Sequence, residues 1–191
     1  IQAPSEAEAQ CAFLNERGDV DFVGSSDFDC LLYGAPNMVR NLTLSTRKRL
    51  PSGVYVSVNP ELIELKTVLE NLGINQDQLI VLGILVGTDF NDGVPKIGPK
   101  SALKLVKQYH DFEELFKIVN ADFNWKQIYA TFKNMPIIKN YKLVWKKPDV
   151  ERVMKILVDE HEFNQERVQK NIDRILNIKK TKEQGNLTKW F

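Results

Sequence analysis

The residues of this chain that could do chemistry are acids, and they fall in three places. Glu6 and Glu8 stand at the start of a predicted helix, Asp27 and Asp29 follow a predicted strand, and Asp89 follows an apolar helix. Ligands of α/β sheets bind beyond the carboxyl ends of strands, where Asp27 and Asp29 lie. If the five carboxylates meet, each pair about 4 Å apart repels by ~4 kcal/mol at an effective dielectric constant of 20, so cations are needed. All-oxygen ligands without a Cys or His cluster favour Mg²⁺ or Mn²⁺, and several acids can hold two ions about 4 Å apart for phosphoryl chemistry.

Each acidic cluster, taken singly, also has a structural explanation. Glu8 fits a capping box with Ser5, and Glu6 is an acid that the helix dipole favours in a first turn. Residues two apart on a regular helix point about 200° apart, so both bind an ion only if Glu6 lies at an irregular entry to the helix. An Asp-x-Asp pair is common in loops, and Asp89 fits a helix cap. The metal hypothesis therefore depends on the clusters meeting in space.

The net charge of +1 hides a division along the chain. Residues 1–92 carry 6 Lys and Arg against 13 Asp and Glu, a net charge of −7, whereas residues 93–191 carry 20 against 12, a net charge of +8. This division suggests cations bound in the first part and a polyanion in the second. The alternative is a solvated basic face on ordinary helices.

Length and composition indicate a folded domain with an appendage. The chain has 191 residues, of which 43% are hydrophobic and 27% charged, and no window approaches the ~20 apolar residues of a membrane span. Cys11 and Cys30 are too few for a disulfide framework, and no leader segment precedes them, so we expect a reducing, intracellular compartment. The chain opens at Ile1 without a methionine, so we expect a piece of a longer protein.

The elements that must position these acids can be predicted from capping and periodicity. Ser5 and Glu8 predict a helix over residues 6–17, and a short strand follows over residues 20–26. Residues 38–44 and 54–58 predict a hairpin with a basic tip. Pro60 predicts the start of a helix that ends at Gly73, and Asn75 predicts the start of a second helix that ends near residue 87. Beyond Gly93 the pattern is helical, over residues 99–109, 111–119, 124–132, 149–161 and 164–179, followed by a polar tail over residues 181–191.

A glycine-rich turn precedes the basic helices. Gly93 and Gly98 bracket an apolar pair, and Lys100, Lys104 and Lys107 share one face of the helix that Pro99 starts. Backbone N–H groups at a helix N-terminus bind phosphate and position a duplex without reading its sequence. We expect Gly93, Lys96, Gly98, Lys100 and Lys104 to bind the phosphates of a nucleic-acid duplex. The alternative is an ordinary turn between two packed helices.

The tail carries an apolar cluster that its own polar surroundings cannot bury. One turn of helix places Leu187 beside Trp190 and Phe191, with Gln184 three residues before Leu187. A groove on a partner protein would receive this cluster. The alternative is a tail that folds back on its own domain.

At this point the motifs resemble a known family, the structure-specific nucleases of the flap endonuclease type. The resemblance rests on the segments 3–9, 27–29, 31–34, 87–89 and 93–102, in this order. It implies an α/β fold, with a mixed or parallel central sheet flanked by helices in a PIN-like nuclease core. An all-helical region with a helix-two-turn-helix DNA-binding motif follows that core. The implied domains are a nuclease core segment over residues 1–92, a DNA-binding region over 93–180 and a clamp-binding tail over 181–191.

The same resemblance implies an activity and its cofactors. The family cuts branched DNA at the base of a 5′ flap in replication and repair, with two Mg²⁺ ions, or Mn²⁺, held by seven acids. Five of them correspond to Glu6, Glu8, Asp27, Asp29 and Asp89. The other two and a helical arch lie in an N-terminal part that this chain lacks, so the chain alone is expected to be catalytically incomplete.

The resemblance also implies partners and a second cation. Gln184, Leu187, Trp190 and Phe191 correspond to the motif that binds the sliding clamp, and the end at Phe191 is similar to archaeal members. A K⁺ ion can bind the family's glycine turn through backbone carbonyls, here those of Gly93, Val94 and Ile97, although Lys96 replaces the usual glycine. We expect a monomer, in the cytoplasm or nucleoid of an archaeon or the nucleus of a eukaryote.

Two other functions stay open. The chain could be a fragment that binds DNA and the clamp without cutting, since it lacks two acids and the arch. It could also be a related exonuclease or a repair endonuclease of the same superfamily, which only substrate tests separate from a flap enzyme.

Overall fold

The computed structural model describes residues 1–42, 47–144 and 146–178, and it divides the chain into two compact units, Ile1–Lys139 and Asn140–Phe191. The boundary that charge predicts at residue 92 falls inside the first unit, so the functional division between residues 1–92 and 93–180 stays a prediction. In the described residues no helix is both long enough and apolar enough to cross a membrane.

A small mixed sheet forms the base of the first unit. Its strands are β1 (Val23–Gly24), β2 (Asn37–Arg40) and β5 (Glu61–Glu64), in the order β1-β2-β5. β1 runs parallel to β2, and β2 runs antiparallel to β5. The side chains of Met38 and Val39 are both buried although they point to opposite faces of β2, because helices cover this central strand. The mixed sheet flanked by helices that the sequence predicted is confirmed.

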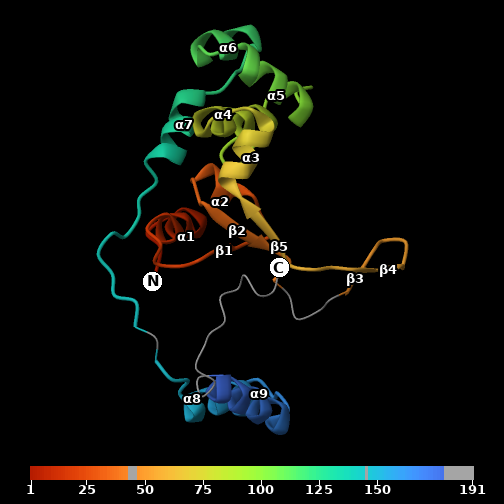
Figure 1. Ribbon diagram of the computed structural model, residues 1–191, viewed down its shortest axis with the longest axis vertical. Coiled ribbons are helices and arrows are strands. Elements are labelled where there is room, and N and C mark those ends of the chain that lie inside the picture. Colours follow the sequence, from red (N-terminus) through yellow and green to blue (C-terminus); the bar gives the residue numbers. More distant parts are fainter. Residues whose placement is uncertain (43–46, 145, 179–191) are drawn as a thin grey trace. The chain divides into compact units, whose positions relative to one another are not determined.

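Two helices lie against the start of this sheet, α1 (Ala7–Glu16) and the short α2 (Asp29–Leu32). The buried Asn15 fixes α1 in place, because its amide donates to the carbonyls of Val20 and Asp21 and its Oδ1 accepts from the backbone N–H of Asn37 at 2.8 Å. Figure 1 shows α1 and α2 beside the strands, with α2 on the side of α4. The end of β1 and the starts of both helices therefore lie near one another.

The first part of the chain corrects several predicted boundaries. Glu6 is the N-cap of α1 and makes no side-chain capping bond, so the predicted Ser5–Glu8 capping box is wrong. The predicted strand over residues 20–26 shortens to β1. The helix predicted from Pro60 begins only at Leu65 as α3 (Leu65–Leu72), because residues 61–64 pair with β2 as strand β5. Backbone pairing across the sheet overrides the local helix signal here.

The predicted hairpin also differs in its pairing. Residues 37–40 belong to the central sheet, and the hairpin is formed instead by β3 (Arg47–Arg49) and β4 (Tyr55–Ser57). The basic segment is therefore a strand, and the tip is the turn over residues 50–54, where Gly53 takes a φ of +84°. Residues 43 and 44 of the predicted first strand lie outside the described residues.

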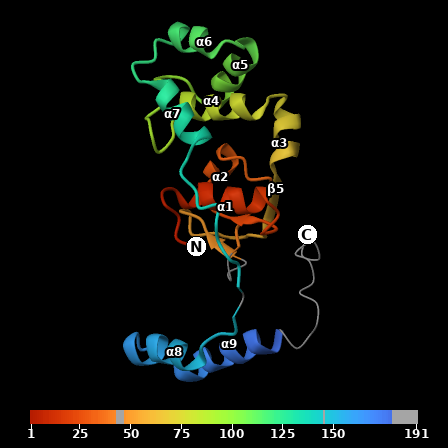
Figure 2. The same cartoon turned by 90° about the vertical axis from the view of Figure 1, so that its left-hand side faces the viewer.

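Four helices complete the first unit: α4 (Gln76–Val86), α5 (Pro99–Gln108), α6 (Phe112–Ile118) and α7 (Trp125–Lys133). They agree with the predicted ranges within one residue at nearly every end. The capping box at the start of α4 is confirmed, since Asn75 accepts from the backbone of Gln78 and the Gln78 side chain accepts from the backbone of Asn75. Figure 2 shows these helices together beyond the sheet. α4 lies centrally among them, and its residues Ile80, Ile84 and Leu85 are fully buried.

The second unit is helical in its described residues. Helix α8 (Val150–Met154) continues as a π-helical stretch, η1 (Lys155–Glu160), and α9 (Gln165–Ile178) follows. Two side chains of α9, Val168 and Ile172, are buried four residues apart on one face. The predicted helix over residues 149–161 is therefore correct in extent, with a wider turn in its second half.

Candidate active site

All five predicted acids come together. They line one small cavity of about 50 Å³, together with Tyr33 and Phe90. The acids lie on four short segments: the start of α1 (Glu6 and Glu8), the turn after β1 (Asp27), the first residue of α2 (Asp29) and the loop after α4 (Asp89). Glu6 is the non-helical N-cap residue, with extended backbone, which is the irregular entry that lets Glu6 and Glu8 face the same cavity. The structure therefore assembles the acidic cluster, and the catalytic role of its members stays a prediction.

The cluster is electrostatically uncompensated. Burial, followed by the charges of Asp89, Asp27, Glu8 and Glu6, raises the pKa of Asp29 above its ordinary value. In the described part of the chain, none of the ion pairs to a Lys or Arg involves any of these five acids. Carboxylates gathered in this way favour a bound cation, because nothing else nearby offsets their mutual repulsion.

The donor set fits hard divalent cations, with water in between. Among the described residues, no three acids, histidines or cysteines stand close enough together to hold a metal ion directly. The cavity of about 50 Å³ has room for water, since one water molecule needs about 10–15 Å³ by this measure. Mg²⁺ keeps several of its waters and needs only one or two carboxylates in direct contact. The arrangement therefore suits a hydrated ion better than a cage made only of protein oxygens.

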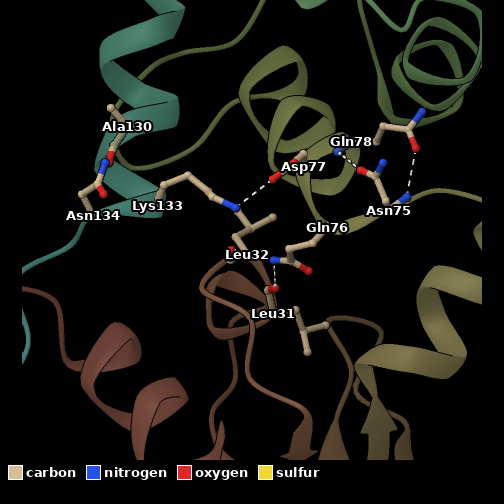
Figure 3. A network of polar contacts seen from close by, with 9 residues as sticks. All are labelled: Leu31, Leu32, Asn75, Gln76, Asp77, Gln78, Ala130, Lys133 and Asn134. Atoms are coloured by element: carbon tan, nitrogen blue, oxygen red, sulfur yellow. Dashed lines mark hydrogen bonds and ion pairs between the residues drawn. The ribbon is translucent and has the colours of Figure 1, made fainter. Parts of the chain in front are cut away.

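The helix that carries Asp29 is held by the start of α4. The side-chain amide of Gln76 donates to the carbonyls of Leu31 and Leu32, both at 2.9 Å, which satisfies acceptors that the end of a helix leaves free (Figure 3). One residue later, Asp77 accepts from the ammonium group of Lys133 in α7 at 2.9 Å (Figure 3). Helices α2, α4 and α7 are thus connected by polar side chains just behind the acidic cluster.

The loop that carries Asp89 is fixed on both sides. Thr88 and Asn91 form a β-bridge with a 2.8 Å side-chain bond, and the amide of Asn91 donates to the carbonyl of Ile84 at 2.8 Å. Gly93 takes a φ of +80°, and a Cβ there would lie 2.4 Å from the carbonyl oxygen of Val86. Only glycine allows this close approach of the loop to the end of α4.

A wider groove opens beside the acidic cavity. It has a volume of about 590 Å³ and shares Asp27, Asp29 and Asp89 with the cavity, while Phe28 and residues 86–88 and 91 supply the rest of its lining. The guanidinium of Arg40 lies 4.5 Å from the centre of the Phe28 ring, which holds the residue between the two aspartates. A polymeric substrate could therefore reach the acids from this open side.

Sequence reasoning missed the aromatic part of the site and the helix α2. Tyr33 and Phe90 line the cavity, and both rings pack on Phe132 of α7, with centroid distances of 5.1 and 5.4 Å. The available signal was spacing, because Tyr33 lies four residues after Asp29 and so shares a face with it once α2 is formed.

The predicted DNA-binding residues lie around the start of α5. Lys100 and Lys104 are exposed, opposite the buried Ala102 and Val106 of the same helix. Lys96 is exposed and takes a φ of +68°, so it adopts the left-handed conformation that glycine favours. Helices α4 and α5 pack against each other on either side of residues 87–98. A helix-two-turn-helix motif at this place stays a prediction.

The predicted clamp-binding residues lie outside the described residues, namely Gln184, Leu187, Trp190 and Phe191.

Comparison with known proteins shows similarity in both sequence and fold. Residues 1–89 match the family model described as the XPG I-region. The solved flap endonuclease-1 of Methanococcus jannaschii superposes with a TM-score of 0.81 at 41% identity, over 96% of this chain and 54% of that one. The catalytic core of Rad2 superposes with a TM-score of 0.71 at 22% identity, over 93% of this chain and 67% of that one, which indicates a shared fold. The part of this chain that holds the acidic cluster is therefore similar in sequence to the XPG I-region, and the fold is similar to that of flap endonuclease-1.

The chain is also similar in sequence to archaeal flap endonucleases, in agreement with the resemblance of its motifs. It is 45% identical to flap endonuclease 1 of Ignicoccus hospitalis, over 100% of this chain and 56% of that protein. It is 47% identical to flap endonuclease 1 of Korarchaeum cryptofilum, over 100% of this chain and 57% of that protein. The chain thus spans somewhat more than half the length of the curated relatives that it matches.

Proposed function

We propose that this chain provides metal-binding and duplex-binding parts of a metal-dependent, structure-specific 5′ flap endonuclease of DNA replication and repair. The observation that carries this proposal is the meeting of Glu6, Glu8, Asp27, Asp29 and Asp89 at one cavity, where no Lys or Arg of the described residues pairs with them. The relatives, which are named flap endonuclease 1, support the same activity.

In this proposal the five carboxylates hold two Mg²⁺ ions, or Mn²⁺, partly through water. Bound divalent ions lower the pKa of a water for attack on a phosphodiester and offset the charge that develops on the attacking and leaving oxygens. The chain's own contribution is to fix the acids: Gln76 holds α2 with Asp29, and the Thr88–Asn91 bridge holds the loop with Asp89. The groove beside Asp27 and Asp29 would admit the scissile phosphodiester.

We further propose that the turn over residues 93–98 and the start of α5 hold the phosphates of a duplex. Gly98 is the N-cap of α5 and supplies no side-chain capping bond, so the first N–H groups of that helix are open to an anion. Lys96, Lys100 and Lys104 add exposed positive charge at the same end. Recognition would follow the shape and the strand ends of the DNA rather than its sequence, because phosphate contacts carry no base information. K⁺ binding at the carbonyls of Gly93, Val94 and Ile97 is part of this proposal.

The clamp-binding role of the tail rests on its sequence. Leu187, Trp190 and Phe191 form an apolar cluster at helical spacing, which suits a groove on a partner. The measurement is calorimetric binding of the chain to the sliding clamp of the same organism. The Phe191→Ala variant should weaken that binding at least tenfold, and equal binding by both proteins would contradict the role.

The test of the nuclease proposal is Mg²⁺-dependent cleavage of an end-labelled 5′-flap duplex by the protein. Asp27→Asn should abolish cutting at the base of the flap, whereas the matched Asp122→Asn variant, at an exposed loop position away from the cavity, should cut as the unaltered protein does. Cutting that survives Asp27→Asn would contradict the role of the cavity. Binding without cutting by the unaltered protein would favour the non-cleaving alternative.

The duplex-binding proposal has its own measurement. The affinity for a plain duplex should fall linearly on a logarithmic scale with salt, and each lysine that neutralises a phosphate contributes about 0.9 to that slope. Replacing Lys100 and Lys104 by Ala should therefore reduce the slope by about 1.8, to the extent that both contact phosphates. Lys66→Ala, which removes an exposed lysine on α3, is the control and should leave the slope unchanged. An unchanged slope in the double variant would exclude the start of α5 as the duplex site.

A further inference from the structure

The acidic cavity contains a single side chain that can donate a hydrogen bond. Its lining consists of the five carboxylates, Phe90 and Tyr33. Ionised carboxylates only accept, and the phenylalanine ring has no polar atom, so the hydroxyl of Tyr33 is the one donor among these side chains. A water molecule inside this cavity can direct its hydrogens to the carboxylates, while its oxygen can accept a hydrogen bond only from the Tyr33 hydroxyl among these side chains.

The ring of Tyr33 is held in place by its neighbours. It packs on Phe132 at 5.1 Å between centroids, and Phe132 is itself 6% exposed and contacts Phe90 edge-on. The backbone N–H of Tyr33 donates to the carbonyl of Asp29 at 3.1 Å, which fixes the residue at the end of α2. The ring therefore keeps one orientation, and the hydroxyl stays with the acids.

The acids surround this hydroxyl from several elements. The pKa of Tyr33 is raised above its ordinary value, mainly by burial and then by the charges of Glu6, Asp29, Glu8 and Asp89. These four acids come from α1, α2 and the loop after α4, so the hydroxyl sits among them rather than beside one. Among the described residues, the hydrogen bond of Tyr33 runs from its backbone N–H to the carbonyl of Asp29 and leaves the hydroxyl out. The donor is therefore available to a molecule inside the cavity.

We propose that Tyr33 is a positioning residue of the metal site: its hydroxyl donates a hydrogen bond to a water molecule that the carboxylates enclose together with the cation. This inference rests on the proposed metal-binding function and deepens it. The cavity of about 50 Å³ leaves room for that water, and the carboxylates can accept its protons. Tyr33 thereby sets the direction of the water's lone pairs toward the cation.

The proposal predicts a defined loss of metal affinity. Outer hydrogen bonds of metal sites contribute about 10–100-fold in affinity, so Tyr33→Phe should weaken Mg²⁺ binding about 10-fold. The ring and its packing on Phe132 stay the same in this variant. Tyr129→Phe is the matched control, because Tyr129 is also half-buried and its hydroxyl bonds a carboxylate, Asp77, outside the cavity.

The experiment titrates Mg²⁺ alone into the 191-residue chain by calorimetry, for the unaltered protein and both variants. A second titration follows tyrosine-sensitised luminescence of Tb³⁺ alone, which requires a phenol close to the bound ion and which a merely structural effect would not remove. Thermal unfolding without metal compares the folded stability of the three proteins. We expect Tyr33→Phe to bind Mg²⁺ about 10-fold more weakly and to lose most of the sensitised emission, while Tyr129→Phe matches the unaltered protein.

Three results of these titrations would overturn the proposed role of Tyr33. Equal Mg²⁺ affinity in Tyr33→Phe and the unaltered chain would overturn the role of Tyr33 and leave the metal site in place. Equal losses in both tyrosine variants would also overturn it, since the effect would then be general. If the unaltered chain binds neither ion, the metal site is absent, and the proposed function fails along with this inference.

Discussion

Asp29 provides the sharpest test of the electrostatics of the site. Replacement by asparagine keeps the size of the side chain and removes one charge from the cluster. Because burial and the charges of Asp89, Asp27, Glu8 and Glu6 all raise the pKa of Asp29, the charged form is the unfavourable one in the metal-free fold. Asp29→Asn should therefore stabilise the protein when no metal is present.

The size of the stabilisation by Asp29→Asn depends on how far the acidic cluster is exposed to solvent. The side chain of Asp29 is half-buried, and Asp27 and Asp89 are exposed, so solvent screens their repulsion. Two unit charges 4 Å apart interact by about 1 kcal/mol at the dielectric constant of water, and four neighbours at larger separations add up to roughly 1–2 kcal/mol. At about 2–4 °C per kcal/mol for a chain of this size, the Tm should rise by roughly 2–8 °C.

The assay is calorimetric unfolding at pH 7 with EDTA and again with Mg²⁺. With Mg²⁺ the order should reverse, because a ligand that binds only the folded state stabilises it and Asp29→Asn binds it less well. Asp122→Asn is the matched control, since Asp122 is exposed on the loop between α6 and α7 and should shift the Tm in neither condition. A metal-free Asp29→Asn protein that melts at or below the unaltered one would refute the idea that the five carboxylates repel one another.

Three further outcomes are expected. The folded-state pKa of Asp29 lies above its ordinary value of 3.8, so its contribution to stability is complete below pH 3.8 and is lost as the pH rises through the raised folded pKa. Urea unfolding of the metal-free protein across this pH range should show the loss of stability. The Asp29→Asn variant should not show it. Gly93→Ala should cost about 3 kcal/mol or more in urea unfolding, because its Cβ would lie 2.4 Å from the carbonyl oxygen of Val86 at a φ of +80°. Lys96→Gly should gain about 1 kcal/mol of stability at its φ of +68° and should weaken duplex binding, measured by fluorescence anisotropy.

Each of these outcomes has a control. Gly98→Ala should cost less than about 1 kcal/mol, because a Cβ there meets nothing within 4 Å and its φ is −92°; a similar cost at Gly93 and Gly98 would contradict the close approach of the loop. If Asp29→Asn follows the same pH profile as the unaltered protein, other groups cause the loss. Lys66→Ala controls for the removal of a positive charge, so equal weakening by Lys66→Ala and Lys96→Gly would argue against a phosphate contact at the turn.

Local signals in the sequence predicted the helical part of the fold well. The Asn75–Gln78 capping box and Pro99 at the first helical position define the starts of α4 and α5 within a residue. These signals work because capping and periodic burial act over a few residues. The same local logic failed at residues 61–64, where the edge of β2 offered backbone partners that no local pattern reveals.

The sequence predicted the acidic residues of the candidate site, but only part of the way in which they are arranged. The sequence identified the five acids from their types and places at element ends, and those acids do meet at one cavity. Tyr33 was not among the predicted residues, because its role depends on the short helix α2 and on the ring of Phe132, which lies 99 positions later in the chain. Such a contact follows only from packing.

By itself, the sequence determined the chemistry available to this protein: oxygen ligands without sulfur or imidazole clusters, a basic region after an acidic one, and strong helix starts. The tertiary structure decided where that chemistry is concentrated. It placed Gln76 against the end of α2, brought Gly93 against Val86 and enclosed the acids with Tyr33 in a cavity of about 50 Å³. The physical reason is that side-chain type is a property of each residue, whereas repulsion, burial and hydrogen bonding depend on distances that only the packed chain sets.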